Sequence, residues 1–146
     1  MKKLLFLLIG ALLFSSPAFA ARVVTNYIIT ATTLDADPTA VSGTARLTSA
    51  EKTAFLVRYD ETEVGGISVA ITVQISDDNT TWIASSFHDF AGGATLQTSE
   101  TLTADGNYYL WLSPDITAPY VKLIVTATGS DADDTAVVSA RIITQE

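Results

Sequence analysis

Apolar and polar side chains alternate strictly over residues 66–76. Branched aliphatic residues occupy every second position there, namely Ile67, Val69, Ile71, Val73 and Ile75. Because successive side chains of a strand point to opposite faces, this segment has one apolar face and one mostly polar face. β-Branching and a period of two both argue against a helix. We predict a central strand that buries its Ile and Val side chains in the core.

Segments of similar character recur along the chain, separated by turn residues. We predict further strands at residues 22–32, 44–48, 53–60, 80–87, 94–104, 107–113, 120–128 and 135–144, with 94–104 an edge strand or an extended loop. Asp77-Asp78-Asn79 predicts a tight turn after the central strand. Eight or nine strands without a credible helix are typical of an all-β, antiparallel β-sandwich of jelly-roll type.

The first twenty residues have the features of a bacterial-type secretory signal peptide. Two lysines, Lys2 and Lys3, precede a short apolar segment, and a small-x-small cleavage motif ends at Ala20. The apolar segment is about half as long as a membrane-spanning helix requires. We therefore expect cleavage after Ala20, a secreted, extracellular protein without a membrane anchor, and one β-sandwich domain over residues 21–146.

Composition and charge exclude several classes of function. The chain has no cysteine, which excludes disulfides and thiolate metal sites. Loss of Lys2 and Lys3 with the signal peptide leaves six basic against sixteen acidic residues, a formal charge of −10. Nucleic acids and anionic membranes both require basic patches, so we expect neither as a partner.

The remaining composition favours self-association. An exported chain without disulfides is held together by its core, its hydrogen bonds, bound ions or its neighbours in an assembly. Charged residues are few and threonine is abundant, as expected for sheets whose outer faces are partly covered. We predict a non-catalytic structural protein that binds copies of itself, as the subunit of a filament, a matrix or a surface layer.

The first predicted strand, residues 22–32, is a candidate for joining such subunits. Its apolar side chains lie on both faces, and a stretch with Asp, Pro and Gly follows it. A terminal strand on such a tether either pairs within its own sheet or adds to the exposed edge of a neighbour. The candidate assembly residues are Val23, Val24, Tyr27, Ile28 and Ile29.

The only histidine, His88, does not predict an enzyme. It lies in Ser85-Ser86-Phe87-His88-Asp89, but the members of a catalytic triad converge from distant segments. Neighbouring residues of a strand also point to opposite faces. One histidine without cysteine is a poor basis for a transition-metal site. We therefore predict no catalytic residues and no cofactor, apart from the calcium alternative that follows.

Crowded carboxylates near the C-terminus suggest that alternative. Asp131, Asp133 and Asp134 lie within six residues, and oxygen ligands gathered in a turn are what calcium requires. The spacing lacks the ligand ladder and the terminal Glu of an EF-hand. A calcium site and a solvated turn both stay open.

Aromatic side chains suggest a second class of function. Flat rings stack on pyranose sugars, and Trp82, Tyr109 and Trp111 are the candidate platform. Core packing is the other explanation, because aromatic side chains bury large areas. Tyr109 and Trp111 share one face of their strand, opposite Leu110 and Leu112, so one of these faces is exposed or covered by a partner. A carbohydrate- or surface-binding module is thus the alternative function.

Three motifs resemble known families. A strand that ends in Ser76-Asp77-Asp78-Asn79-Thr80-Thr81-Trp82 is similar to a hairpin of tailed-phage structural β-sandwich proteins and of discoidin-like, galactose-binding-like domains. The later motifs Gly106-Asn107-Tyr108 and Tyr120-Val121-Lys122 resemble the same group, with Lys122 where Arg is usual. The resemblance implies a β-sandwich and, as a further alternative, a phage-virion-like structural protein. The signal peptide departs from virion proteins, which assemble in the cytoplasm.

Overall fold

The computed structural model describes residues 22–35, 40–47, 52–61, 66–89, 96–113, 116–129 and 134–145. These residues form ten strands: β1 (Val23–Asp35), β2 (Ala40–Arg46), β3 (Lys52–Glu61), β4 (Ile67–Ser76), β5 (Ile83–Ser85), β6 (Phe87–Asp89), β7 (Ser99–Leu102), β8 (Gly106–Leu112), β9 (Tyr120–Gly129) and β10 (Thr135–Gln145). They include no helix, and hence none long and apolar enough to cross a membrane. The predicted signal peptide lies outside the described residues.

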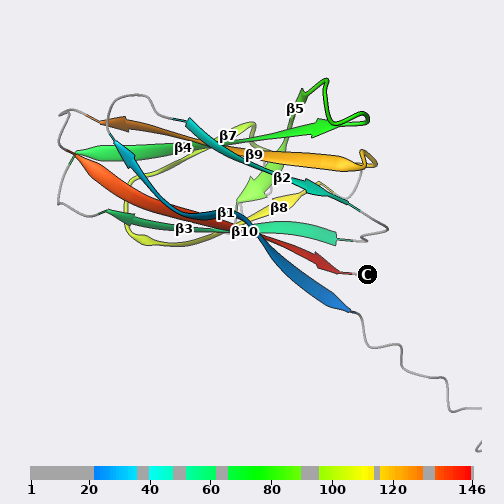
Figure 1. Cartoon of the computed structure of the whole chain (residues 1–146), viewed down its shortest axis with the longest axis horizontal. Helices are drawn as coiled ribbons and strands as arrows, with labels where there is room; N and C mark the ends of the chain where they lie inside the picture. The colour runs from blue at the N-terminus through cyan, green and yellow to red at the C-terminus, as the bar shows by residue number, and fades with distance from the viewer. Residues whose placement is uncertain are drawn as a thin grey trace, which may run out of the picture.

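The strands form two antiparallel sheets packed as layers (Figure 1). Sheet A has the order β1-β10-β3-β8-β6. Sheet B has the order β2-β9-β4-β5, and β7 pairs with a different part of β4. The predicted fold class, an all-β antiparallel sandwich, is confirmed.

The core lies between the sheets and is built from the predicted inward faces. Ile67, Val69, Ile71 and Val73 of β4 are all buried, as are the alternating apolar residues of β3 and β9. At the end of β4, Ile75 is half-buried but pairs with the buried Val121 and packs against the core, and Ser76 beyond it is buried as well. The predicted inward face therefore holds along β4, with less complete burial at Ile75.

Ser76 is buried because it begins the turn that leaves β4. Its Oγ accepts the backbone N–H of Asn79 at 2.9 Å and donates to the Asp78 carboxylate at 3.0 Å. Asn79 adopts a left-handed conformation with φ of 61°, which asparagine tolerates. Hydrogen bonds from Thr80 and Thr81 to the Asp78 carboxylate hold the pKa of Asp78 well below its ordinary range. The predicted turn is confirmed.

The prediction of one continuous strand over residues 80–87 is wrong, because the chain there passes from one sheet to the other. β5 pairs with β4 in sheet B, and β6 pairs with β8 in sheet A. Phe87 is fully buried between them, and its backbone forms two hydrogen bonds with Gln97. Burial of this large ring requires the chain to cross the sandwich edge. The described residues consequently hold ten strands instead of eight or nine.

The opposite edge of the sandwich is closed by β1 and β2, which extend to Asp35 and from Ala40, into the stretch between the strands predicted at 22–32 and 44–48. A Cβ at Gly43 of β2 would lie 2.6 Å from the Ile28 carbonyl carbon and 2.9 Å from Ile29 Cγ1. Glycine therefore allows the two edge strands to approach closely. The register of β1 on β10 shifts around Ile29, as in a β-bulge.

A buried tyrosine connects the two sheets. The hydroxyl of Tyr59, on β3, donates to the backbone oxygen of Ile67, on β4, at 2.8 Å. Burial, together with the nearby carboxylates of Glu61 and Asp105, raises the pKa of Tyr59 to about 12.

Candidate functional site

The outer face of sheet A carries an unusual set of side chains, arranged in rows across the strands. Tyr27, Arg141, Leu56 and Tyr109 are consecutive cross-strand partners on β1, β10, β3 and β8. Directly opposed residues of antiparallel strands share a face, so these four side chains form one row. Tyr27 is 56% exposed, whereas Tyr109 is half-buried.

Two further rows flank the first. On one side, Ser139, Arg58 and Asn107 are partners across β10, β3 and β8. On the other side, Trp111 opposes both Ala54 and His88 and is 42% exposed. Aromatic rings and arginines thus occupy a surface where a solvated sheet would carry small polar side chains.

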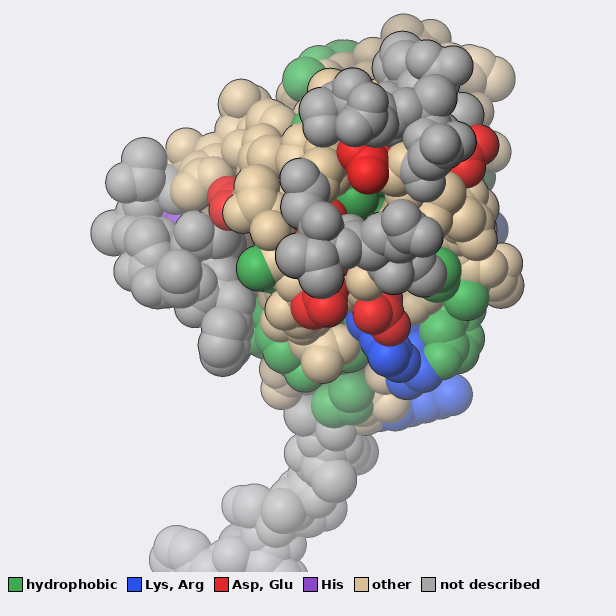
Figure 2. Space-filling model, turned by 90° about the vertical axis from the view of Figure 1, so that its left-hand side faces the viewer, with side chains coloured by type: hydrophobic (Ala, Val, Ile, Leu, Met, Phe, Trp, Pro, Cys, Tyr) green, Lys and Arg blue, Asp and Glu red, His purple; other side chains and the backbone are tan. Residues whose placement is uncertain are grey.

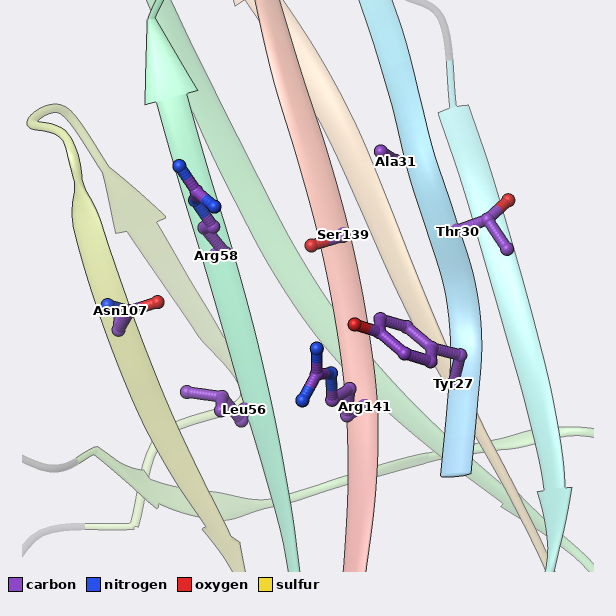
Figure 3. Close-up of a pocket in the computed structure, with 8 residues that line it drawn as sticks. All are labelled: Tyr27, Thr30, Ala31, Leu56, Arg58, Asn107, Ser139 and Arg141. Carbon is purple, nitrogen blue, oxygen red and sulfur yellow. The ribbon is translucent and has the colours of Figure 1, made fainter. Parts of the chain in front are cut away.

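The first two rows border an open groove of about 490 Å³. Figure 3 shows Tyr27 projecting from β1 on one side of the groove and Asn107 from β8 on the other, with the two arginines between them. We call this surface the arginine groove. Its lining is Tyr27, Thr30, Ala31, Leu56, Arg58, Asn107, Ser139 and Arg141.

Both arginines of the groove interact with neighbours while keeping contact with solvent. The Arg141 guanidinium carbon lies 4.0 Å from the centroid of the Tyr27 ring, a cation–π contact. Arg58 forms a 3.2 Å ion pair with Asp60, and both side chains are more than half exposed. Such a surface pair contributes little to stability, so Arg58 can exchange this partner for another carboxylate.

Carboxylates gather at one end of the molecule (Figure 2), and one of them, Asp60, pairs with Arg58 of the groove. Strand β1 ends there at Asp35, and β3 ends at Glu61. The backbone N–H of Glu61 donates to Asp105 at 2.6 Å, and the backbone N–H of Gly66 donates to Glu61 at 3.2 Å. We call this surface the acidic end; its described members are Asp35, Asp60, Glu61, Asp105 and Asp134.

The predicted sugar platform is divided between the two sheets. Tyr109 and Trp111 lie together on the outer face of sheet A, as their shared strand face requires. Trp82 instead lies beside sheet B, where Lys122 Nζ is 3.8 Å from its ring centroid. The structure brings two of the three rings together, and sugar binding by them stays a prediction.

The calcium candidate lies partly outside the described residues, which include neither Asp131 nor Asp133. Asp134 lies so close to Gly66 that a Cβ there would be 2.6 Å from the Asp134 carboxyl carbon. Among the described residues, no group of three or more His, Asp or Glu side chains is placed to hold a metal ion. Calcium binding stays a prediction.

His88 lies on β6, half-buried, beside Trp111 of β8. Ser85 ends β5 with its side chain buried, in the other sheet. These neighbours in sequence therefore belong to different sheets.

The candidate assembly strand forms β1 and pairs with β10 of its own chain from Val23 to Asp35. Of the five predicted residues, Ile29 alone is fully buried; Val24 and Ile28 are half-buried, and Val23 and Tyr27 are exposed. Leu34, further along β1, is its second buried side chain. Whether the strand also pairs between subunits stays a prediction.

Sequence reasoning missed the two arginines of the groove. The alternation of residues 53–60 places Leu56 and Arg58 on the face opposite Phe55, which was the available signal. No local pattern indicates that Arg141, which is far away in the sequence, lies opposite Leu56 on the neighbouring strand.

Comparison with known proteins shows similarity of fold alone. No protein-family model and no curated protein matches the chain. One solved structure that matches is the SPBc2 prophage-derived protein YomS, with a TM-score of 0.51 and 16% identity over 87% of this chain and 96% of that chain.

Another is a chain of infectious bursal disease virus, Gx strain, with a TM-score of 0.53 and 14% identity over 86% of this chain. This chain corresponds to 33% of that viral chain. The likenesses agree with the predicted resemblance to phage structural β-sandwich proteins. The resemblance to discoidin-like domains stays a prediction.

Proposed function

We propose that this chain is a non-catalytic, exported structural protein whose subunits self-associate into an extracellular filament, matrix or surface layer. The observation that carries the proposal is the terminal edge strand β1. It spans thirteen residues but contributes only two fully buried side chains, Ile29 and Leu34. Its attachment thus depends largely on backbone hydrogen bonds to β10.

Those hydrogen bonds are equivalent within one chain and between chains. A β1 strand that leaves its own β10 can form the same register with the β10 of another copy. The exposed Val23 and Tyr27 add apolar surface to this edge, and apolar surface on an edge strand favours intermolecular pairing. Fold similarity to a prophage-derived protein and to a viral chain supports a structural role.

The test uses the mature chain, residues 21–146, and a truncated chain without residues 21–32. We expect size-exclusion chromatography and negative-stain microscopy to show assembly of the mature chain. The truncated chain should stay folded, fail to assemble and bind an added peptide of residues 21–32. A peptide with Ile29→Asp is the matched control and should not bind, because Ile29 occupies the core. If the truncated chain unfolds, or assembles as before, strand exchange is wrong.

Two other functions have support. The two fold likenesses favour a phage-virion-like structural protein. Tyr109 and Trp111, together on one outer face, favour a carbohydrate- or surface-binding module. A monomeric mature chain that binds a glycan array would establish the second, and retention of residues 1–20 in the native protein would argue for the first.

A further inference from the structure

The outer face of sheet A has the composition of a protein interface. Tyr, Trp and Arg are enriched at interfaces and supply most of the residues that dominate binding energy. Here Tyr27, Tyr109 and Trp111 lie in two adjacent rows on the same outer face as Arg141, which contacts Tyr27. Two of these rings are 56% and 42% exposed, so a covering partner would remove substantial apolar area from water.

The charge of this face indicates what the partner brings. Of the six basic residues in the mature chain, Arg58 and Arg141 lie in adjacent rows of one groove. Guanidinium groups recognise carboxylates with two parallel hydrogen bonds. A partner for the groove therefore presents acidic side chains.

This chain itself presents such a surface. Its mature form carries sixteen acidic residues, and the acidic end gathers five of them beside the described strand ends. We propose that the arginine groove docks the acidic end of a second copy of this chain. In this contact Arg58 and Arg141 bind carboxylates of the second copy, and the aromatic rows are covered by it. The inference rests on the proposed self-association and adds to the β1–β10 pairing a second contact between subunits.

The two surfaces are distinct but adjoin at the ion pair of Arg58 with Asp60. The groove faces outward from sheet A, whereas the acidic end lies where β1 and β3 terminate. A contact between unlike surfaces leaves one groove and one acidic end free in every pair. Such head-to-tail contacts continue into open polymers unless the rotation closes a ring.

Reversal of the two arginine charges tests the groove. We expect R58E/R141E to lower the association constant about 30-fold or more in sedimentation velocity at low salt. R46E/K122E is the matched control, because it changes the net charge equally and also removes two cation–π contacts, on the outer face of sheet B. Thermal melts by circular dichroism establish that both variants are folded.

A charge swap tests the partner. Asp35 and Asp60 are both exposed, so D35K/D60K should fold yet fail to assemble. Asp60 also pairs with Arg58 of its own groove, so D60N, which removes only that pair, is the control and should still assemble. A mixture of R58E/R141E with D35K/D60K should restore assembly, because each groove then meets an end of opposite charge. Restored assembly into long polymers supports the head-to-tail contact.

Three results would overturn the inference. If the native chain assembles and R58E/R141E assembles equally well, the groove is not the docking surface. The proposed self-association then stands. If the mixture forms closed dimers only, or stays unassembled, the acidic end is not the occupant. A monomeric native chain whose groove binds alginate oligosaccharides in an Arg58- and Arg141-dependent manner would overturn both this inference and the proposed function.

Discussion

At the scale of single residues, position in the sandwich decides how far side chains of the same type are buried. Ile71 at the centre of β4 is 0% exposed, whereas Ile83 on the short strand β5 is 66% exposed. Burial of a large aliphatic side chain contributes roughly 1.5–3 kcal/mol to stability. The core therefore depends on a few central positions, and substitution there has the largest effect.

Ile71→Asp should unfold the protein. The substitution removes the apolar burial and places a carboxylate among apolar side chains without a partner, which costs more than a small sandwich tolerates. Circular dichroism melts measure the effect. Thr72→Asp, on the half-buried outer side of the same strand, is the control and should retain a cooperative transition. An Ile71→Asp variant with the native melting temperature would contradict the register.

Tyr59→Phe should lower the free energy of unfolding by about 1 kcal/mol at neutral pH, the usual value of one hydrogen bond. It should also change the alkaline behaviour. The pKa of Tyr59 is raised to about 12 in the folded protein, against about 10 when unfolded. Between these two pKa values the tyrosine hydroxyl is deprotonated in the unfolded chain but still protonated in the folded chain. The free energy of unfolding therefore falls as pH rises from about 10 to about 12.

Denaturant midpoints measured at several alkaline pH values check this prediction. The decline that Tyr59 causes should disappear in Tyr59→Phe. Tyr27→Phe, at an exposed ring, is the control and should keep the native pH dependence. If the stability of Tyr59→Phe declines at alkaline pH as much as that of the native protein, other groups cause the decline.

At the scale of elements, the two edges of the sandwich are closed by different means. One edge is closed by the crossing from β5 to β6, which buries Phe87. The other is closed by the approach of β1 to β2 at Gly43. The first depends on an apolar anchor and the second on the absence of a side chain.

Gly43→Ala should loosen the edge formed by β1 and β2. The added methyl group meets the backbone of Ile28, which cannot rotate away, so we expect a loss of about 1–3 kcal/mol. Hydrogen exchange should increase in β1 before it increases in β4. Gly106→Ala is the matched control, because there the methyl group meets the Tyr108 ring at 3.2 Å, a smaller conflict. Equal effects of the two substitutions would refute the close-approach argument.

At the scale of the whole molecule, charge is distributed unevenly. Acidic residues gather at the end where β1 and β3 terminate, while two of the few basic residues lie in the groove of sheet A. Mutual repulsion of the carboxylates destabilises the folded state, and cations reduce it. A specific calcium site would act in addition to this general screening.

Calcium binding at Asp131, Asp133 and Asp134 should raise the melting temperature, because a ligand that binds only the native state stabilises it. Scanning calorimetry in millimolar calcium, compared with chelator, measures the effect. Sodium chloride at equal ionic strength controls for screening, and Asp134→Asn should abolish the calcium-specific part. An equal melting temperature in calcium and chelator would remove the site from consideration.

The sequence predicted where the strands lie better than it predicted which strands pair with one another. The alternation of β3 separates Phe55, Val57 and Tyr59 from Leu56 and Arg58, and the structure buries the first set. The same alternation is compatible with many pairing partners, because the period of two is satisfied beside any strand. For this reason the sequence does not separate Trp82 from Tyr109 and Trp111, although Trp82 lies beside the other sheet.

The sequence alone specifies local features: most of the strands, the inward face of β4 through Ile75 and the turn at Asp78. These follow from side-chain alternation and turn chemistry, which act over a few residues. Only the tertiary structure decided that β10 lies between β1 and β3, which aligns Tyr27, Arg141 and Leu56 in one row. It also decided that residues 80–87 divide between the sheets, because Phe87 is buried where they meet. Such long-range contacts depend on packing of the whole chain, which no short pattern encodes.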